Sequence, residues 1–389
     1  MFSKINIVRS LIVFLLPFQS VTAQTDTNKV KGKNKNISIS IQPSGQSYGI
    51  STESAPKYDS IYVRKYNNRL VVSLFQSTRS YNVLFTQKLV SGSGIDTLST
   101  SNYVAQANNV TGLSFDYDKI SFSLGKSTPL TSDDVYKKGK TSYSDYGFSF
   151  SGSKYRLESS YRRYQGFYDD RTHFYDTAYT AKSPYYQNPS LSTRSFKVKG
   201  LYFMNKKHRF SYSSSYSNTS RQLKTAGSFI LVGNIYNFYM HSDSLIIPPQ
   251  MRSYYGTWAG VNYFNLYGLS FGAGYTFNLV LWKRIFLNLT LTAGWEVQHR
   301  YYKNDIAAFS KQEWSHSFSL IDGRTALGYN GRKFFISVTS ITDYNVYDLK
   351  SMKFEVKFLS GSFNIGYRFP LKEYKPIKKM KENKYYKMF

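Results

Sequence analysis

Apolar and polar residues alternate along most of the chain between Arg69 and Phe369. The clearest run is 269–281, where apolar residues occupy every second position and small or polar residues fill most of the others. After Trp282-Lys283-Arg284 the pattern returns over 285–296. Alternation with a period of two places the apolar side chains on one face of an extended strand. This pattern predicts a hairpin long enough to cross a membrane, which takes about 9 to 11 residues per strand.

Four further hairpins follow the same alternation. Their expected turns are Asp118-Lys119, Gly152-Ser153-Lys154, Asn205-Lys206-Lys207 and Asn330-Gly331. The third would pair a strand at 196–202 with one at 210–216, and the fourth carries the strongest two-residue hairpin signal. Long polar connections separate the hairpins, at 91–111, 126–143, 165–193, 299–315 and 344–353. Short periplasmic turns and longer extracellular loops are typical of bacterial outer-membrane barrels.

The number of strands follows from the position of the turns. If all tight turns lie at one end of the barrel, the chain also enters and leaves the barrel at that end, and the strand number is even. Two further segments, 226–240 and 254–264, give 14 strands if both cross the membrane and 12 if they form an insertion. We therefore predict an all-β protein, a transmembrane antiparallel β-barrel of 12 to 14 strands.

The last strand has one irregularity. Apolar residues at 354, 356 and 358 are out of phase with those at 363, 365, 367 and 369. Such a shift requires a bulge near Leu359 or a change of the apolar face.

Composition agrees with a barrel. Aromatic residues make up 18% of the chain, with 37 Tyr and 29 Phe, and the mean hydropathy is −0.43. This balance fits wide sheets with one polar and one aromatic-rich face. The chain has no cysteine, which excludes disulfides, a thiolate nucleophile and a Cys-ligated zinc site. No stretch approaches the roughly 20 apolar residues of a membrane helix, so only a closed barrel could enter a bilayer.

The N-terminus has the pattern of a secretory signal peptide. Lys4 and Arg9 accompany an apolar run at 11–18, and small residues at 21–23 precede Gln24. The alternative is a buried N-terminal helix. The expected organisation is a cleaved signal peptide (1–23), a flexible polar leader (24–57), the barrel (58–369) and a basic periplasmic tail (370–389).

The formal charge is +28, and cleavage of the signal peptide would leave +26 because it removes Lys4 and Arg9. This excess could attract nucleic acid, an anionic membrane surface or an anionic solute. Export argues against nucleic acid. For the tail, the alternatives are a solvated extension and electrostatic contact with an anionic periplasmic partner or the inner leaflet.

Several stretches resemble a known family: YDSIYVRKYNNRLVVSLFQSTRSYNVLF from Tyr58, AGSFILVGNIYNF from Ala226, GLSFGAGYTF from Gly268, and the closing FNIGYRF. They are similar to an uncharacterised outer-membrane β-barrel family of Bacteroidota, the domain of unknown function 4421 type, over roughly 58–369. The resemblance implies a protein of the cell outer membrane and supplies no catalytic residues.

The closing stretch also resembles the signal by which the barrel-assembly machinery recognises a last strand. The residues that carry this resemblance are Gly366, Tyr367 and Phe369. The chain departs from the usual pattern because it continues beyond Phe369, which leaves Phe389 as the alternative terminal residue.

Basic residues on the predicted inner face are the candidates for a binding wall. They are Arg156, Arg162, Lys197, Lys199, Lys357 and Arg368. A cationic lumen favours anionic solutes. The alternatives are that these residues balance inward acids such as Glu158 and Glu355, or contact lipopolysaccharide phosphates at the rim.

Tyrosines of the predicted loops could stack on sugar rings or belong to the aromatic girdle at the membrane interface. Thr97 and Thr177 lie in Asp-Thr-aliphatic patterns, similar to the sequence that this bacterial group O-glycosylates after export. We treat both threonines as hypothetical acceptors.

No catalytic motif is present. The five histidines are scattered, so we predict no enzyme, no cofactor and no metal site. The leading function is a channel or uptake component for a small anionic or saccharide solute. One alternative is a structural or envelope-assembly barrel with a plugged lumen, and another is an outer-membrane barrel hydrolase. The expected partners are outer-membrane lipid, lipopolysaccharide and the barrel-assembly machinery.

Overall fold

A computed structural model of the protein describes residues 58–87, 100–106, 109–306, 309–349, 352–372, 375–383 and 386. The expected signal peptide and leader lie outside the described residues, and so does Phe389. Within the described ranges, no helix is long and apolar enough to cross a membrane.

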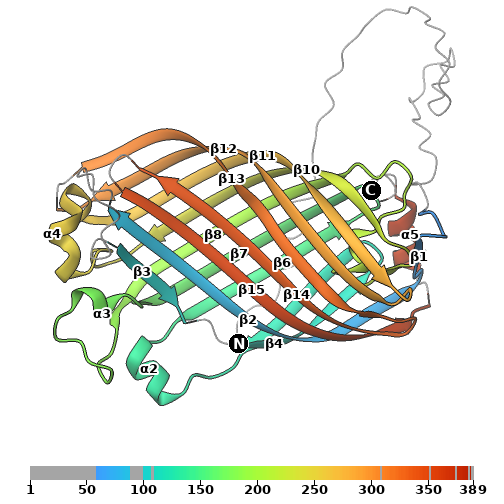
Figure 1. Cartoon of the computed structure of the whole chain (residues 1–389), viewed down its shortest axis with the longest axis horizontal. Coiled ribbons are helices and arrows are strands. Elements are labelled where there is room, and N and C mark those ends of the chain that lie inside the picture. The colour runs from blue at the N-terminus through green and yellow to red at the C-terminus, as the bar shows by residue number, and fades with distance from the viewer. Residues whose placement is uncertain are drawn as a thin grey trace, which may run out of the picture. The chain divides into compact units, whose positions relative to one another are not determined.

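Among the described residues, thirteen strands form one antiparallel sheet that closes into a barrel (Figure 1), because β2 pairs with β15 on one side and with β3 and β4 on the other. The strands are β2 (Arg69–Gln87), β3 (Thr100–Ala105), β4 (Val110–Tyr117), β5 (Ile120–Ser127), β6 (Ser142–Ser151), β7 (Tyr155–Asp169), β8 (Tyr186–Phe203), β10 (Ala226–His241), β11 (Val261–Leu281), β12 (Ile285–Asn304), β13 (Phe309–Asn330), β14 (Phe334–Asp348) and β15 (Met352–Pro370). β3 and β4 pair with successive parts of β2. β4 leads through β5 and β6 to β7, whereas β3 pairs with β7 directly, so the described strands give a ring of twelve where β4 adjoins β2 and of ten where β3 does.

The prediction of an antiparallel barrel with an even strand number is confirmed. The segment 226–240 is a strand, β10, whereas only the end of 254–264 is extended, as the start of β11. The first residue of β2, Arg69, pairs with the last residue of β15, Pro370. The chain therefore enters and leaves the barrel wall at neighbouring positions.

The outer face of the wall is apolar. Phe271 and Trp295 are 66% and 69% exposed, and many other large apolar side chains on the same face are exposed as well. An apolar outer face around a closed sheet is the arrangement of a transmembrane barrel, whose outward side chains contact lipid.

Tight turns gather at one end, which we call the turn end. They lie at 118–119, 152–154 and 282–284, as predicted, and at 331–333, where Asn330-Gly331 is the expected turn but Asn330 is instead the last residue of β13. Trp282 and Lys283 both have positive φ, 48° and 59°, which is the backbone of the type I′ turn that matches strand twist. β1 (Val63–Lys65) and α5 (Lys375–Glu382) lie at this end too (Figure 1).

The hairpin predicted around Asn205 is wrong. β8 ends at Phe203, and 204–225 folds into the barrel instead of forming a strand of the wall. Phe210 and Tyr212 pack against Leu201 and Phe203 in a buried cluster. Their alternation reflects burial inside the barrel rather than contact with lipid.

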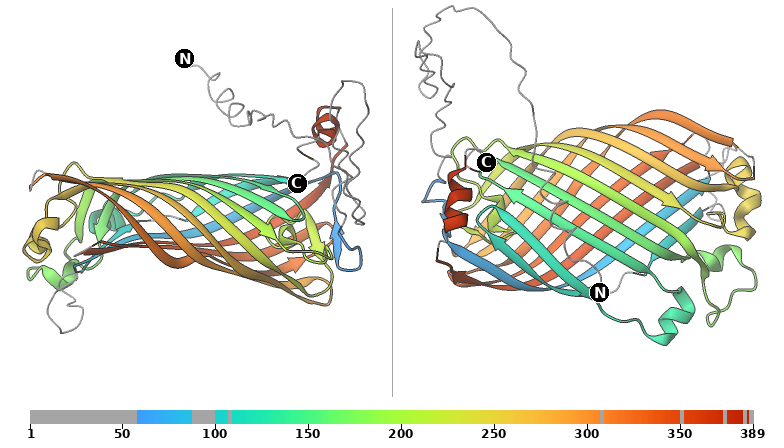
Figure 2. Two further views of the ribbon diagram at one scale, coloured as in Figure 1. Left: turned by 90° about the horizontal axis from the view of Figure 1, so that it is seen from above. Right: turned by 180° about the vertical axis from the view of Figure 1, so that it is seen from behind.

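The opposite end, which we call the loop end, carries α2 (Ser132–Lys138), α3 (Thr172–Tyr175) and α4 (Arg252–Tyr255). The two views in Figure 2 show the same separation of these helices from β1 and α5. Two predicted long loops are mostly strand: β12 and β13 leave only 305–308 between them, and β14 and β15 leave 349–351.

The irregularity in β15 is a change of face. Phe354, Val356 and Phe358 are buried inside, whereas Phe363 and Ile365 are exposed outside. The registers of β15 with β14 and with β2 run through this point without a shift, so there is no bulge. The strand itself is regular, and what changes along it is the environment inside the barrel.

Candidate functional site

The lumen is divided along its length into three layers, which are an inner plug at the turn end, a charged belt in the middle and an apolar cap at the loop end. We define the plug as residues 204–225, with the 3-10 turn η3 (Tyr212–Ser214) and strand β9 (Ser220–Gln222). β9 pairs with β1, so the segment just before the barrel helps to hold the plug.

Polar side chains of the wall hold the plug in place. The Asn278 amide group donates to the Ser211 carbonyl oxygen at 3.1 Å, and Ser215 donates to Asn278 at 2.9 Å. Tyr216 donates to Asn288 at 2.7 Å. The Asn330 amide donates to the Ser214 carbonyl oxygen at 2.8 Å. The plug is therefore docked by specific hydrogen bonds from several strands.

Arg368 of β15 also contacts the plug; it is 0% exposed and is a larger side chain than the other fully buried residues that hold the plug. Its guanidinium donates to the Asn218 carbonyl oxygen at 2.8 Å, to the Gly331 carbonyl oxygen at 3.0 Å and to the Asn330 side-chain oxygen at 2.6 Å. The ring of Tyr66 lies 4.4 Å from its central carbon. Arg368 thus joins the plug, a turn and β15, and it does not line an open passage.

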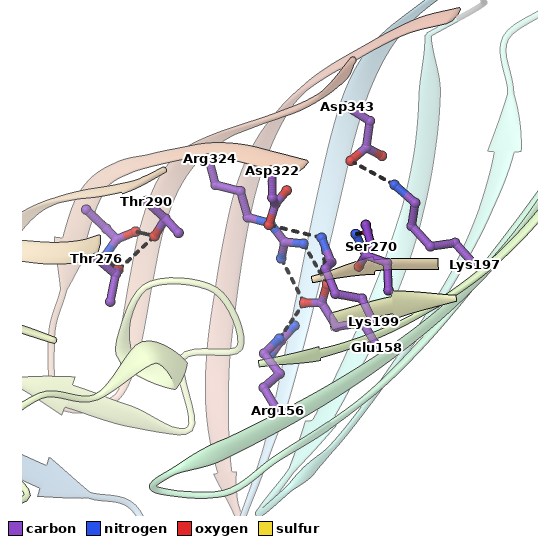
Figure 3. A network of polar contacts seen from close by, with 12 residues as sticks. Arg156, Glu158, Lys197, Lys199, Ser270, Thr276, Thr290, Asp322, Arg324 and Asp343 are labelled. Atoms are coloured by element: carbon purple, nitrogen blue, oxygen red, sulfur yellow. Dashed lines mark hydrogen bonds and ion pairs between the residues drawn. The ribbon is translucent and has the colours of Figure 1, made fainter. Parts of the chain in front are cut away.

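The charged belt is built around Glu158 of β7 (Figure 3). Arg324 binds both of its carboxylate oxygens, at 2.7 and 2.6 Å, and Arg156 lies at 2.5 Å. Lys199 completes the group at 3.5 Å and also pairs with Asp322 at 3.0 Å. Arg324 and Asp322 come from β13, across the lumen from β7 and β8. A bidentate guanidinium–carboxylate pair is among the strongest side-chain contacts.

A second group of ion pairs lies beside the first. Asp343 of β14 accepts from Arg162 at 3.0 Å and pairs with Lys197 at 3.6 Å. Asp145 of β6 pairs with Arg79 of β2 at 2.6 Å. Buried charged side chains need oppositely charged partners, because the free-energy cost of removing them from water is otherwise uncompensated. The belt therefore ties six strands together across the inside of the barrel.

The apolar cap closes the loop end. We define it as residues 242–260, which contain α4. Ile246, Met251 and Tyr255 are at most 1% exposed and pack with inward side chains of the strands. The Tyr255 hydroxyl donates to the Phe85 carbonyl oxygen at 3.0 Å, and Tyr103 donates to the carbonyl oxygen of Ile246.

Between plug and cap, a cavity of about 350 Å³ remains at the level of the belt. Its lining includes six basic side chains, Arg79, Arg156, Arg162, Lys197, Lys199 and Arg324. Three acidic side chains, Asp116, Glu158 and Asp343, also line it. The lining thus carries an excess of three basic groups over acidic ones, and we call this space the belt cavity.

The predicted cationic wall is assembled only in part. The structure brings Arg156, Arg162, Lys197 and Lys199 together in the belt. Lys357 lies on the opposite face, where it is half exposed and pairs with Glu355 at 2.9 Å. Its neighbours Val356 and Phe358 take the inward positions, because the loop-end half of the lumen is apolar. The prediction that Lys357 and Glu355 face the lumen is therefore wrong.

Sequence reasoning missed five members of the belt. They are Arg79, Asp145, Asp322, Arg324 and Asp343. Each stands on the inner face of its strand, so alternation contained a signal for them. The partners, however, come from distant parts of the chain, and Glu158 and Arg324 are 166 residues apart.

The other predicted residues have separate positions. Tyr367 and Phe369 are exposed on the outer wall with ring centres 4.8 Å apart, and Gly366 is buried against Phe335. Their role as an assembly signal stays a prediction. Thr177 is exposed in the connection after α3, where O-glycosylation also stays a prediction, and Thr97 lies outside the described residues.

The basic tail docks on the barrel's own turns. Lys381 donates to Asn68 at 2.8 Å, and Tyr386 donates to Asp118 at 2.7 Å. Lys119 donates to the carbonyl oxygen of Tyr386. Burial raises the pKa of Asp118, but the ion pair with Lys65 and the Tyr386 hydrogen bond outweigh it and hold the pKa below its usual value.

An arginine cluster lies at the turn end beside the plug. Arg221 of β9 is 7% exposed, and Arg64 stands opposite it in the register of β1 and β9. Burial lowers the pKa of Arg221, and the nearby charges of Arg64, Arg284 and Arg332 lower it further. The Nε atom of Arg221 is buried without a hydrogen-bond acceptor. We call these four residues the turn-end arginines.

Among the described residues, no group of three or more His, Asp or Glu side chains could hold a metal ion. A comparison with family models matches residues 57–369. The chain belongs to the family described as Domain of unknown function (DUF4421). No curated protein matches its sequence.

Similar solved structures include membrane barrels at very low sequence identity. The outer membrane protease OmpT from Escherichia coli is 7% identical with a TM-score of 0.34, covering 78% of this chain and 98% of that one. The Pseudomonas putida toluene transporter TodX is 7% identical with a TM-score of 0.25, covering 81% and 95%. The translocator domain of autotransporter NalP from Neisseria meningitidis is 8% identical with a TM-score of 0.27, covering 80% and 90%. Similarities at this level carry no assignment of activity.

Proposed function

We propose that this DUF4421 protein is an outer-membrane barrel with a plugged lumen and a structural or envelope-assembly role. The observation that carries the proposal is the closure of both ends by the chain itself, with the plug at one end and the cap at the other. A diffusion porin needs a continuous aqueous passage along its axis. The apolar exterior supports placement in a membrane, and the turn end is the periplasmic side by the usual orientation of bacterial barrels.

Swelling of protein-containing liposomes in a neutral sugar tests this closure. The intact protein should leave the swelling rate at that of protein-free liposomes. A control variant, with 206–224 and 243–258 each replaced by a short Gly-Ser linker, should increase it because both obstructions are gone. Rapid swelling with the intact protein would contradict the proposal.

The turn end supplies the surface for an envelope role. The turn-end arginines and the docked basic tail place positive charge on the side assigned to the periplasm. Arg284 and Arg332 are exposed, and no described carboxylate forms an ion pair with any of the four arginines. Such a surface favours an acidic envelope partner, and association with it should weaken as salt rises.

Isolated peptidoglycan sacculi, which carry carboxylates, provide the probe for this contact. The nanodisc-embedded protein should co-sediment with sacculi at low salt, and Arg284→Gln with Arg332→Gln should reduce the bound fraction severalfold. Arg163→Gln, at an exposed arginine on the outer wall, is the matched control and should have no effect. Equal co-sedimentation of the wild type, the double variant and the control would contradict the proposal that the turn end binds an acidic envelope partner.

A second candidate function is uptake of a small anion, and the basic excess of the belt cavity favours it. In this case the plug or cap must move during transport. A radiolabelled anion such as phosphate should then accumulate in liposomes faster than a cation of similar size, and equal rates would argue against it.

A further inference from the structure

The barrel wall has an incomplete seam between β5 and β6. The two strands pair at only three positions near the turn end, of which the last joins Phe122 to Phe148. Beyond that point, β5 continues along β4 and β6 continues along β7, each paired on one side only. We call the space between residues 123–127 and 142–147 the lateral window.

The window is closed again toward the loop end. The Gln106 backbone N–H donates to the Thr141 hydroxyl at 2.9 Å, and that hydroxyl donates to the Gly166 carbonyl oxygen at 2.7 Å. The Thr128 backbone N–H donates to the Asn109 carbonyl oxygen at 2.8 Å. The window is therefore a bounded opening in the side of the barrel, distinct from both axial ends.

The belt cavity passes through this opening. Its lining includes Glu158 and Lys199, which are inside the barrel, and also Phe122 and Phe148, which are exposed on the outer wall. A second cavity of about 400 Å³ lies on the loop side and shares Arg79 with the first. At Gly147 an added Cβ would meet no atom within 4 Å, so the path beside this residue is open.

One ion pair spans the window from the inside. Arg79 belongs to β2 and Asp145 to β6, and both β4 and β5 lie between these strands in the order of the sheet. The pair at 2.6 Å thus links strands that do not touch through their backbones. The Nε atoms of Arg79 and Arg162 are buried without an acceptor, so both guanidinium groups retain a donor for a further oxygen.

Physical chemistry restricts what can fill the window. Strand edges cannot face hydrocarbon with their backbone groups unpaired, and they are tolerated only where a polar cavity meets them. The cavity behind the window is rich in basic groups. The wall outside it is apolar, with Phe122, Leu124 and Phe148 exposed. A molecule that satisfies both surfaces has an acidic head group and an alkyl chain.

We propose that the lateral window is a portal for a membrane amphiphile with one alkyl chain and an oxyanion head group, either a carboxylate or a phosphate. The head group enters the belt cavity and takes the place of Asp145 at Arg79. The chain stays outside, along the apolar wall. This site does not depend on an axial pore, so it stands independently of the plugged-lumen proposal.

Binding of two radiolabelled probes, laurate and dodecyl phosphate, to the nanodisc-embedded protein tests the portal. At least one should bind saturably, and the tighter of the two identifies the head group. Unlabelled dodecyl maltoside and dodecyltrimethylammonium should fail to displace the bound probe. Displacement by either of them, or saturable binding of neither probe, would overturn the proposal.

Two substitutions place the binding at the window. Gly147→Trp should abolish it by filling the opening, and Arg79→Gln should weaken it at least tenfold by removing the head-group donor. The matched controls are Gly200→Trp, where an added Cβ also meets no atom within 4 Å, and Arg163→Gln on the outer wall. The controls should bind as the wild type does. Unchanged binding in Gly147→Trp, with folding checked by heat-modifiable gel migration, would refute the assignment even if Arg79→Gln fails to fold.

Discussion

Replacement of Arg368 by alanine should release the plug. Its guanidinium donates three hydrogen bonds, to Asn218, Gly331 and Asn330, from a fully buried position. Each orphaned acceptor costs about 1 kcal/mol, the low end of the range, because water from the turn end can reach it after release. The total of about 3 kcal/mol corresponds to a factor of more than 100 in the docking equilibrium.

A nitroxide on Ser213→Cys can report this release, because the chain has no other cysteine and Ser213 borders a cavity of about 510 Å³. For a slope of about 1 kcal/mol per molar urea, Arg368→Ala should lower the urea concentration of label mobilisation by about 3 M. Arg368→Lys should recover part of the loss, since an ammonium group lacks the planar fork of donors.

Arg163→Ala, at the exposed arginine on the outer wall, serves as the control and should leave the midpoint unchanged. Refolding all variants in detergent separates plug docking from cellular assembly, in which the end of β15 has its own predicted role. If the label in Arg368→Ala mobilised at the wild-type urea concentration, the conclusion that Arg368 holds the plug would be wrong.

Three further predictions concern the belt, the tail and the last strand. Glu158→Gln leaves the buried Arg324, Arg156 and Lys199 without their carboxylate partner. It should destabilise the refolded barrel by about 3 to 5 kcal/mol, which is measured as a lower urea midpoint of unfolding. An unchanged midpoint would mean that the belt does not stabilise the barrel. Tyr386 and Lys381 of the docked tail add to the larger effect of Lys65 in holding the pKa of Asp118 below the unperturbed value of about 3.9, so docking is strongest where Asp118 is ionised and weakens as pH falls through the docked value. A nitroxide on Lys378→Cys should therefore become mobile on acidification, and a pH-independent spectrum would contradict this. Phe369→Ala should reduce assembly of the barrel in cells but leave its refolding in vitro unchanged. The control Phe363→Ala, at a side chain of similar exposure, should change neither. Equal assembly of the two variants would argue against Phe369 as part of an assembly signal.

The wall was largely predictable because its strands obey one simple rule. Lipid outside imposes apolar side chains at every second position, and tight turns such as Trp282-Lys283-Arg284 connect neighbouring strands. The plug was not predictable from alternation. Phe210 and Tyr212 show the same period as a lipid-facing strand, and only the tertiary structure reveals that they pack inside.

The same ambiguity explains the error at Lys357. A lumen that is polar along the whole barrel would place Lys357 inside, but the loop-end half of the lumen is apolar around Phe354 and Phe358. The inward side chains of β15 are therefore apolar near the loop end and polar near the turn end, whereas its outward side chains change in the opposite sense. The belt was predictable only in part because alternation identifies the inward basic residues of one strand, whereas pairing across the lumen depends on how the ring closes.

Single-channel recording in a planar bilayer tests whether the lumen is closed. With the intact protein inserted, no steady current above that of the bare bilayer is expected at moderate voltage, because plug and cap fill the two ends of the lumen. A stable ohmic conductance of porin size from the intact protein would contradict the closed lumen and with it the proposed role.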